Sequence, residues 1–379
     1  MPGLIVNPET PHYVPAPPTK VDLEYADLPI IDFSEMATKE GRLKLAQQAR
    51  DAMAEHGFLY VINHGYTTSE TERIFDIADI PFSRVTEEEK KTYVAQIKQT
   101  GSYQGYKPRQ YWHIDGGVRD QLEHYNINKD VNKRQHPEAL RPFLPEIDRF
   151  ARHNHEEVLY PILRLLAVGM ELPEETFVNM HGFSSIGETY GANSTENKRI
   201  IDLTYSFDKH SYPRSEEEES KTKNVWLKGH TDFGTITILY SQPVAALQIL
   251  TKDGKWKWVK HIENGLVINV GDSLEFLSGG FYRATIHRVV QPPPDQHRYT
   301  RLGAFYFALT DDNVKLAPIM ESPVLQRFGV TKRFDGVEPP TMEAWRKGRT
   351  AAYGQTELKA NENGVEEEII NGVVVKHYN

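Results

Sequence analysis

The chain has 379 residues, 39% of them hydrophobic, with a formal net charge of −9 at pH 7, and this length can bury a substantial core. It has no cysteine, which excludes disulfides, thiol catalysis and iron–sulfur clusters, and its negative charge argues against a nucleic-acid partner. Residues 1–20 are rich in proline, and no stretch approaches 18 apolar residues, so we expect a cytoplasmic protein without a signal peptide or a membrane partner.

The first half of the chain is predicted to hold most of the helices. Helical spacing is found over residues 39–56, 68–80, 86–96 and 144–170. Gly57 is expected to end the first helix before an apolar strand at 58–62, and Pro161 is expected to kink the last. Between the third and fourth of these helical segments, residues 101–128 are rich in aromatic residues and are expected to be loop-like.

Short apolar strands separated by Gly-rich turns dominate the second half. They are expected at residues 235–240, 247–250, 256–259, 265–272, 274–277, 284–290 and 302–307. This spacing indicates a jelly roll, or double-stranded β-helix, so the fold class is α/β with a mainly β core flanked by helices.

Segments around the jelly roll have their own predictions. The acidic stretch 211–224 is read as a solvated loop, with a mobile lid as the alternative. After the jelly roll, residues 339–353 have a helical pattern, and Asn371-Gly372 is a hairpin signal.

One constellation of residues points to a metal. His230 and Asp232 are two apart and are expected on one strand, where alternate side chains share a face. His287 lies on a second predicted strand and Arg301 on a third. Two imidazoles and one carboxylate form the facial triad of non-heme Fe(II) oxygenases, although zinc accepts the same ligands.

A second His-x-Asp pair, His113 and Asp115, has a different context. It runs directly into Gly116-Gly117 and is therefore expected in a loop rather than on a stiff strand.

The motifs resemble those of the 2-oxoglutarate- and Fe(II)-dependent dioxygenase superfamily, in its isopenicillin N synthase-like branch. The resemblance rests on His-Thr-Asp-Phe-Gly, Leu-Gln-Ile-Leu, Asn-Val-Gly-Asp and His-Arg-Val-Val at residues 230–234, 247–250, 269–272 and 287–290, and on upstream matches at 28–33 and 55–65. It implies an arm (1–26), an N-terminal dioxygenase module (27–140), a helical scaffold (141–195), a jelly-roll core (196–310) and a C-terminal extension with a helix and a hairpin (311–379).

The resemblance implies that His230, Asp232 and His287 bind iron and that a late-strand arginine grips the distal carboxylate of 2-oxoglutarate. Arg301 is preferred to Arg298, because the family places an aromatic residue six positions after this arginine, and the two are not expected to point inward together.

The co-substrate site departs from the family pattern at one position. The serine expected two residues after the arginine is Gly303, and Tyr205 is expected to supply a second contact. Phe307 and Tyr106 are expected in the substrate pocket, whereas Phe305 is expected on the opposite face of its strand, in the core.

The implied enzyme couples the oxidative decarboxylation of 2-oxoglutarate to hydroxylation, or a related C–H oxidation, of a small molecule, with specialised metabolism as its expected setting. Fe(II) is the implied cofactor, and 2-oxoglutarate and O2 are co-substrates. Two alternatives stay open. One is an Fe(II) oxidase of the same fold that does not use 2-oxoglutarate, which the missing serine at Gly303 would fit, and the other is a non-catalytic metal-binding module.

Overall fold

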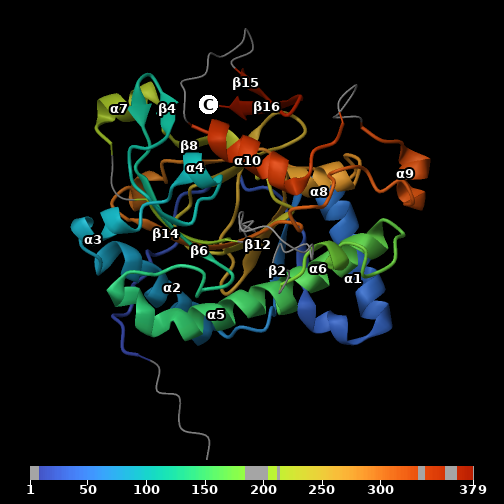
Figure 1. Ribbon diagram of the computed structural model, residues 1–379, viewed down its shortest axis with the longest axis horizontal. Coiled ribbons are helices and arrows are strands. Elements are labelled where there is room, and N and C mark those ends of the chain that lie inside the picture. Colours follow the sequence, from blue (N-terminus) through green and yellow to red (C-terminus); the bar gives the residue numbers. More distant parts are fainter. Residues whose placement is uncertain (1–7, 184–203, 211–213, 332–337, 355–364, 379) are drawn as a thin grey trace, which may run out of the picture.

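The computed structural model consists of two large β-sheets and a two-stranded one, with helices packed against the largest sheet (Figure 1). It describes residues 8–183, 204–210, 214–331, 338–354 and 365–378. Side chains from both large sheets line one cavity, so these sheets face each other as the two halves of a jelly roll.

The larger sheet carries the longest strands of the described chain. Its strand order is β1 (Ile30–Asp32), β2 (Phe58–Ile62), β12 (Leu266–Val270), β9 (Ile236–Tyr240), β14 (Arg301–Ala308), β7 (Thr204–His210), β6 (Leu122–Asn128) and β3 (Gly105–Lys107). Apart from the parallel β1–β2 pair, neighbouring strands are antiparallel.

The smaller sheet carries two of the predicted metal ligands. Its strand order is β11 (Trp256–Trp258), β10 (Leu247–Leu250), β13 (His287–Val290), β8 (Val225–His230), β16 (Val373–Tyr378) and β15 (Val365–Ile370). The last two strands are a hairpin that turns at Asn371-Gly372, and β16 pairs with β8. The C-terminal extension therefore adjoins the strand that carries His230.

In the described residues the helices are α1 (Lys39–Glu55), α2 (Thr68–Ser83), α3 (Glu87–Thr92), α4 (Ile97–Thr100), α5 (Leu144–Arg152), α6 (Tyr160–Gly169), α7 (Glu216–Lys221), α8 (Asp272–Leu277), α9 (Pro323–Phe328) and α10 (Met342–Ala352). The longer helices of the first half of the chain, α1, α2, α5 and α6, lie on the outer face of the larger sheet, whereas α10 lies near the C-terminal hairpin (Figure 1). Between α5 and α6, residues His153–Leu159 are π-helical, which is how the chain accommodates Pro161. None of these helices is long and apolar enough to cross a bilayer.

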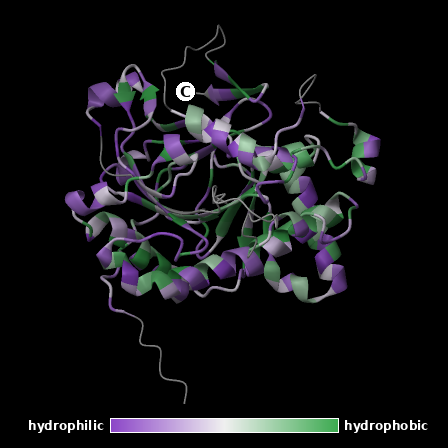
Figure 2. Cartoon of the chain, viewed as in Figure 1, coloured by the Kyte–Doolittle hydropathy of each residue, from purple (hydrophilic) through white to green (hydrophobic). Residues whose placement is uncertain are grey.

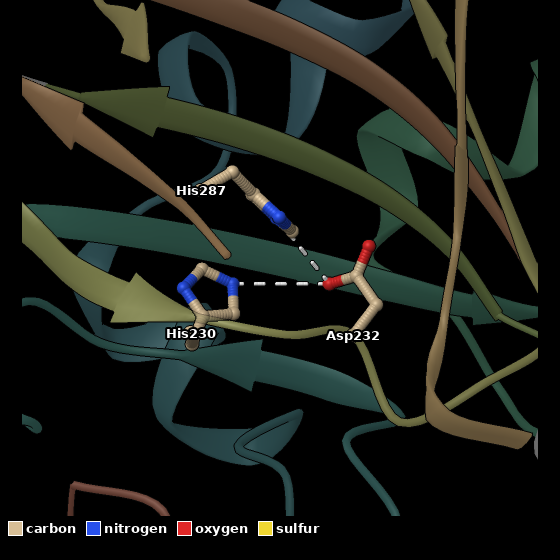
Figure 3. A group of neighbouring side chains, drawn as sticks. All are labelled: His230, Asp232 and His287. Carbon is tan, nitrogen blue, oxygen red and sulfur yellow. Dashed lines mark ion pairs between the residues drawn. The ribbon is translucent and has the colours of Figure 1, made fainter. Parts of the chain in front are cut away.

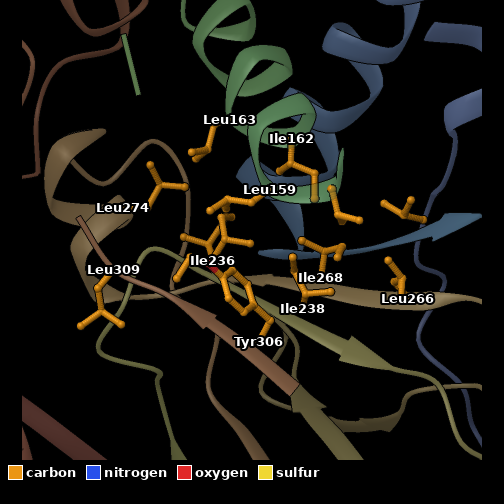
Figure 4. Packing of buried hydrophobic residues seen from close by; sticks show 14 of the residues in the cluster. Leu159, Ile162, Leu163, Ile236, Ile238, Leu266, Ile268, Leu274, Tyr306 and Leu309 are labelled. Atoms are coloured by element: carbon orange, nitrogen blue, oxygen red, sulfur yellow. The ribbon is translucent and has the colours of Figure 1, made fainter. Parts of the chain in front are cut away.

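The main core lies between the larger sheet and α6. Leu159, Ile162 and Leu163 pack on alternate residues of β9 and β12, namely Ile236, Ile238, Leu266 and Ile268 (Figure 4). The intervening residues Thr237, Leu239 and Asn269 face the cavity. Hydrophobic and hydrophilic residues are intermixed around the covering helices, as expected when only one side of a helix is buried (Figure 2).

Three local predictions were wrong. Residues 274–277 belong to α8 rather than to a strand, and the stretch 214–224 contains α7 rather than a loop. The buried Glu219 of α7 accepts a hydrogen bond from the indole of Trp226, so the helix is anchored; residues 211–213 lie outside the described chain. Residues 101–128 hold strands β3 to β6 rather than a loop, and His113–Asp115 is strand β4, paired with β5 (Val118–Arg119).

Candidate metal centre and adjoining cavity

A cavity of about 170 Å³ lies between the two sheets and is lined mostly by apolar and aromatic side chains. His230, Asp232 and His287 share it with Arg301 and with Arg349 from α10. The cavity thus brings together residues that are far apart in the sequence.

The two histidines meet because their strands pair. His230 lies directly opposite His287 in the antiparallel β8–β13 register, and their ring centroids are 4.5 Å apart. Strand β8 ends at His230, so Asp232 lies in the following turn and not on the strand as expected. Its Oδ1 is nevertheless 3.8 Å from Nε2 of His230 and 3.7 Å from Nε2 of His287 (Figure 3).

Backbone carbonyls orient both imidazoles. Nδ1 of His230 donates to the carbonyl of Lys228 at 2.7 Å, and Nδ1 of His287 donates to that of Thr285 at 3.1 Å. Each Nε2 therefore keeps its lone pair for a metal. Burial, with a further effect from His287, lowers the pKa of His230 to about 3, so its imidazole is neutral at pH 7, the form that binds metal.

The carboxylate of Asp232 is held in a matching way. Its Oδ2 accepts hydrogen bonds from Thr237 at 2.6 Å and Asn269 at 2.8 Å, which leaves Oδ1 facing the imidazoles. Burial would raise the pKa of Asp232, but the two histidines and these two donors together lower it, so the group is ionised.

The donor set fits a divalent ion such as Fe(II). The three ligand atoms lie within 4.8 Å of one another, and no other group of three or more His, Asp or Glu residues in the described chain meets that criterion. Three protein ligands leave open positions on an octahedral ion for exogenous ligands.

Arg301 begins β14 and lines the same cavity. Its side chain is 2% exposed, and its Nε has no hydrogen-bond partner among the described residues. Burial lowers the pKa of Arg301 to about 10, partly offset by Asp208 and Tyr13, so the guanidinium remains charged at pH 7. Arg298, in contrast, is exposed and lies against the ring of Tyr299.

The face of β14 that bears Arg301 also carries Phe305, which was expected on the opposite face. Phe305 and Phe307 both line the cavity, with their rings stacked at 5.7 Å, so Phe305 is not a core residue on the opposite face. Residues two apart on a strand point the same way, which places both rings on the side of Arg301. Gly303 lies between Arg301 and Phe305 on this face.

The other two site predictions have different outcomes. The backbone of Tyr205 pairs with Tyr306 on β14, and its side chain lies outside the described structure. Tyr106 is not a pocket residue: it is 1% exposed, packs on Tyr125 and donates a hydrogen bond to the carbonyl of Pro81. It lies on the sheet face that the helices cover.

Among the cavity residues that sequence reasoning missed, four lie close to the metal ligands. Asn269 stands in the recognised Asn-Val-Gly-Asp motif, and Thr237 is five residues after Asp232, so their proximity could have been inferred. Arg349 and Tyr353 carry no motif, and no local signal brings α10 to the site.

Comparisons with known proteins agree with this geometry. Residues 28–146 match a family model described as non-haem dioxygenase in morphine synthesis N-terminal, and residues 198–305 match the 2OG-Fe(II) oxygenase superfamily. The homoarginine-6-hydroxylase 2-ODD-233 of Oryza sativa is 26% identical over 304 residues, covering 75% of this chain and 86% of the relative. A leucoanthocyanidin dioxygenase of Perilla frutescens is 26% identical over 70% of this chain and 68% of its own length.

Solved structures share the fold. The crystal structure of a full-length Neurospora crassa protein in complex with alpha-KG has a TM-score of 0.71 at 22% identity, covering 86% of this chain and 96% of that one. The two family models match in the expected order, and the jelly roll brings two histidines and an aspartate together. The chain therefore belongs to the 2-oxoglutarate- and Fe(II)-dependent oxygenase superfamily, in its isopenicillin N synthase-like branch.

Proposed function

We propose that this oxygenase binds Fe(II) through His230, Asp232 and His287 and binds the distal carboxylate of 2-oxoglutarate through Arg301. The observation that carries the proposal is the state of Arg301. A buried guanidinium whose Nε has no described partner is costly unless an anion completes it. A carboxylate offers the bidentate geometry that a guanidinium requires.

With iron, 2-oxoglutarate and O2 bound, the site would supply the oxidation of a substrate C–H bond coupled to decarboxylation of 2-oxoglutarate to succinate. The chain's own residues bind and orient the cation and the co-substrate. His230, His287 and the ionised Asp232 would hold the cation, with one negative charge from the carboxylate, and Arg301 balances one carboxylate of the co-substrate. The apolar walls exclude bulk water, which strengthens these electrostatic interactions.

The substrate that we propose is a small molecule containing a flat ring. Phe307, Trp112 and Tyr353 contribute aromatic walls to the cavity, and rings stack favourably on such walls. Two related proteins act on or bind compounds of this kind by name: a flavonol synthase/flavanone 3-hydroxylase, and the Neurospora crassa protein, which was also crystallised with alpha-KG and thymine. A role in specialised metabolism and a cytoplasmic location belong to the same proposal.

Tyr205 remains our proposal for a second contact to 2-oxoglutarate on the family pattern alone, because its backbone pairs with Tyr306, whereas Arg301 pairs with His210. The alternatives are less favoured. An oxidase that does not use 2-oxoglutarate would leave Arg301 without a ligand, and a non-catalytic module would have no use for open metal positions.

The test is an anaerobic titration of the Fe(II)-loaded protein with 2-oxoglutarate, monitored by the weak visible charge-transfer absorption of the chelate. We expect a saturable band in wild type that Arg301→Met abolishes or shifts to at least tenfold higher 2-oxoglutarate. Arg298→Met is the matched control, because this exposed arginine is on the same segment. A wild-type protein that binds iron but gives no band would contradict the proposal.

A further inference from the structure

We propose that Arg349, on helix α10 of the C-terminal extension, is a positioning residue that holds the metal-binding turn in its ligating geometry. The inference rests on the proposed function, because it concerns the same Fe(II) site. It assigns a role to a segment that lies beyond both family-model matches, which end at residues 146 and 305.

The guanidinium of Arg349 bridges two turns of the jelly roll. Its Nη2 donates a hydrogen bond to the backbone carbonyl of Thr231 at 2.8 Å, and its Nη1 lies 3.3 Å from Oδ2 of Asp272. Thr231 stands between His230 and Asp232, so this hydrogen bond acts on the short backbone link between two of the three ligands.

The two bridged turns are already in close contact. The amide of Asp272 donates to the carbonyl of Asp232 at 2.7 Å, and that of Ser273 donates to the carbonyl of Gly234 at 3.0 Å. A Cβ at Gly271 would meet the carbonyl oxygen of Gly234 at 2.3 Å, so only glycine permits this approach. Arg349 therefore adds a side-chain clamp across a junction that positions Asp232.

Helix α10 also reaches the first metal ligand. The ring of Tyr353, just after the helix, lies 5.6 Å from the ring of His230 and packs edge-on against Trp112 at 5.0 Å. At the start of the helix, the sulfur of Met342 accepts a hydrogen bond from the hydroxyl of Ser273. Met342 and Arg349 of the helix, and Tyr353 directly after it, thus contact the metal-binding region at three points.

The burial of this ion pair favours a positional role over a purely stabilising one. Arg349 is 4% exposed and Asp272 is 1% exposed, yet Nη1 and both carboxylate oxygens lack hydrogen bonds of good geometry in the described structure. Buried pairs of this kind contribute little net stability, because desolvation offsets their attraction. Groups outside the ligand shell that fix ligand orientation, in contrast, commonly change metal affinity about 10- to 100-fold.

The experiment compares two arginines of the same helix. Arg346→Met is the matched control, because Arg346 is also buried, donates to the carbonyl of Gly101 at 2.7 Å and pairs with Asp312 at 3.3 Å, but does not contact the metal-binding turn in any described interaction. Fe(II) affinity of the full chain is measured anaerobically by competition with a chromogenic chelator, and thermal unfolding is followed in parallel.

We expect Arg349→Met to weaken Fe(II) binding about 10- to 100-fold, whereas Arg346→Met changes it less than about threefold at a similar loss of thermal stability. Arg349→Lys, which can reach one acceptor but not bridge two, should fall in between. If Arg349→Met does not fold, Arg349→Lys and Asp272→Asn carry the test, and both should weaken Fe(II) binding.

The inference is overturned if folded Arg349 variants bind Fe(II) like wild type, or if Arg346→Met weakens binding equally. Failure of the proposed function gives a different result, because wild type itself would then bind Fe(II) no more tightly than His287→Ala.

Discussion

The ring of Phe305 lies over Gly303, two residues back on β14, so closely that a Cβ at position 303 would meet its Cε2 at 2.5 Å. The space that the family's serine would occupy is therefore filled by an aromatic ring. We predict that Gly303→Ser weakens 2-oxoglutarate binding about tenfold, because the displaced ring moves toward Arg301 and the cavity. The measurement is the 2-oxoglutarate titration described above.

The double variant Gly303→Ser/Phe305→Ala provides the control for this prediction. With the ring removed, the serine hydroxyl has room beside Arg301, so binding should recover relative to Gly303→Ser alone. Tighter binding by the single Gly303→Ser variant would show that the ring does not exclude a side chain there.

Arg301 should be required for binding but not for stability. Because its guanidinium is buried without a full set of partners, we predict that Arg301→Met leaves the melting temperature of the ligand-free protein unchanged or raises it. The same variant should lose the stabilisation that 2-oxoglutarate gives to wild type. A fall in melting temperature of more than about 5 °C in the ligand-free variant, which corresponds to roughly 4 kcal/mol for a chain of this length, would indicate a structural role instead.

Thr237 should tune the metal through Asp232. Thr237→Val removes the hydroxyl that donates to Oδ2 at 2.6 Å, and we predict about tenfold weaker Fe(II) binding. The matched control is Thr235→Val on the same segment, whose hydroxyl donates to the carbonyl of Ala308 and does not touch Asp232. That variant should lose stability while keeping its Fe(II) affinity; equal Fe(II) affinities for the two variants would contradict this role.

Buried histidines should make stability depend on pH. Burial lowers the pKa of His155 to about 3 and that of His181 to about 4, whereas both return to about 6.5 in the unfolded chain. Below pH 6.5 the unfolded chain takes up protons that the folded protein cannot. The free energy of unfolding contributed by these groups is therefore constant above pH 6.5 and decreases as the pH is lowered below 6.5.

Each of these histidines should lower the free energy of unfolding at pH 5 by about 2 kcal/mol relative to pH 8. Urea denaturation at pH 8, 6.5 and 5 measures the effect, and His155→Gln, which cannot take up the proton, should show a shallower loss. A constant midpoint from pH 8 to pH 5 would mean that these groups titrate normally in the folded state.

Much of the site could be predicted from the sequence, because the ligand motif is local and the β-strand period brings His230 opposite His287. Errors arose where short apolar runs do not distinguish helix from strand, as at α8, or where a residue's sheet face was misjudged, as at Phe305 and Tyr106. Arg349 was not predictable, because it is 118 residues from Thr231 and only the docking of α10 brings them together.

The most direct test of the central claim is succinate formation. Protein loaded with Fe(II) is incubated with 2-oxoglutarate in air, with and without a panel of small ring-containing compounds, and succinate is quantified. We predict that wild type converts 2-oxoglutarate to succinate, faster with a substrate, and that Arg301→Met and His287→Ala do not. Binding of iron and 2-oxoglutarate without any succinate above the His287→Ala level, with every compound, would contradict the account.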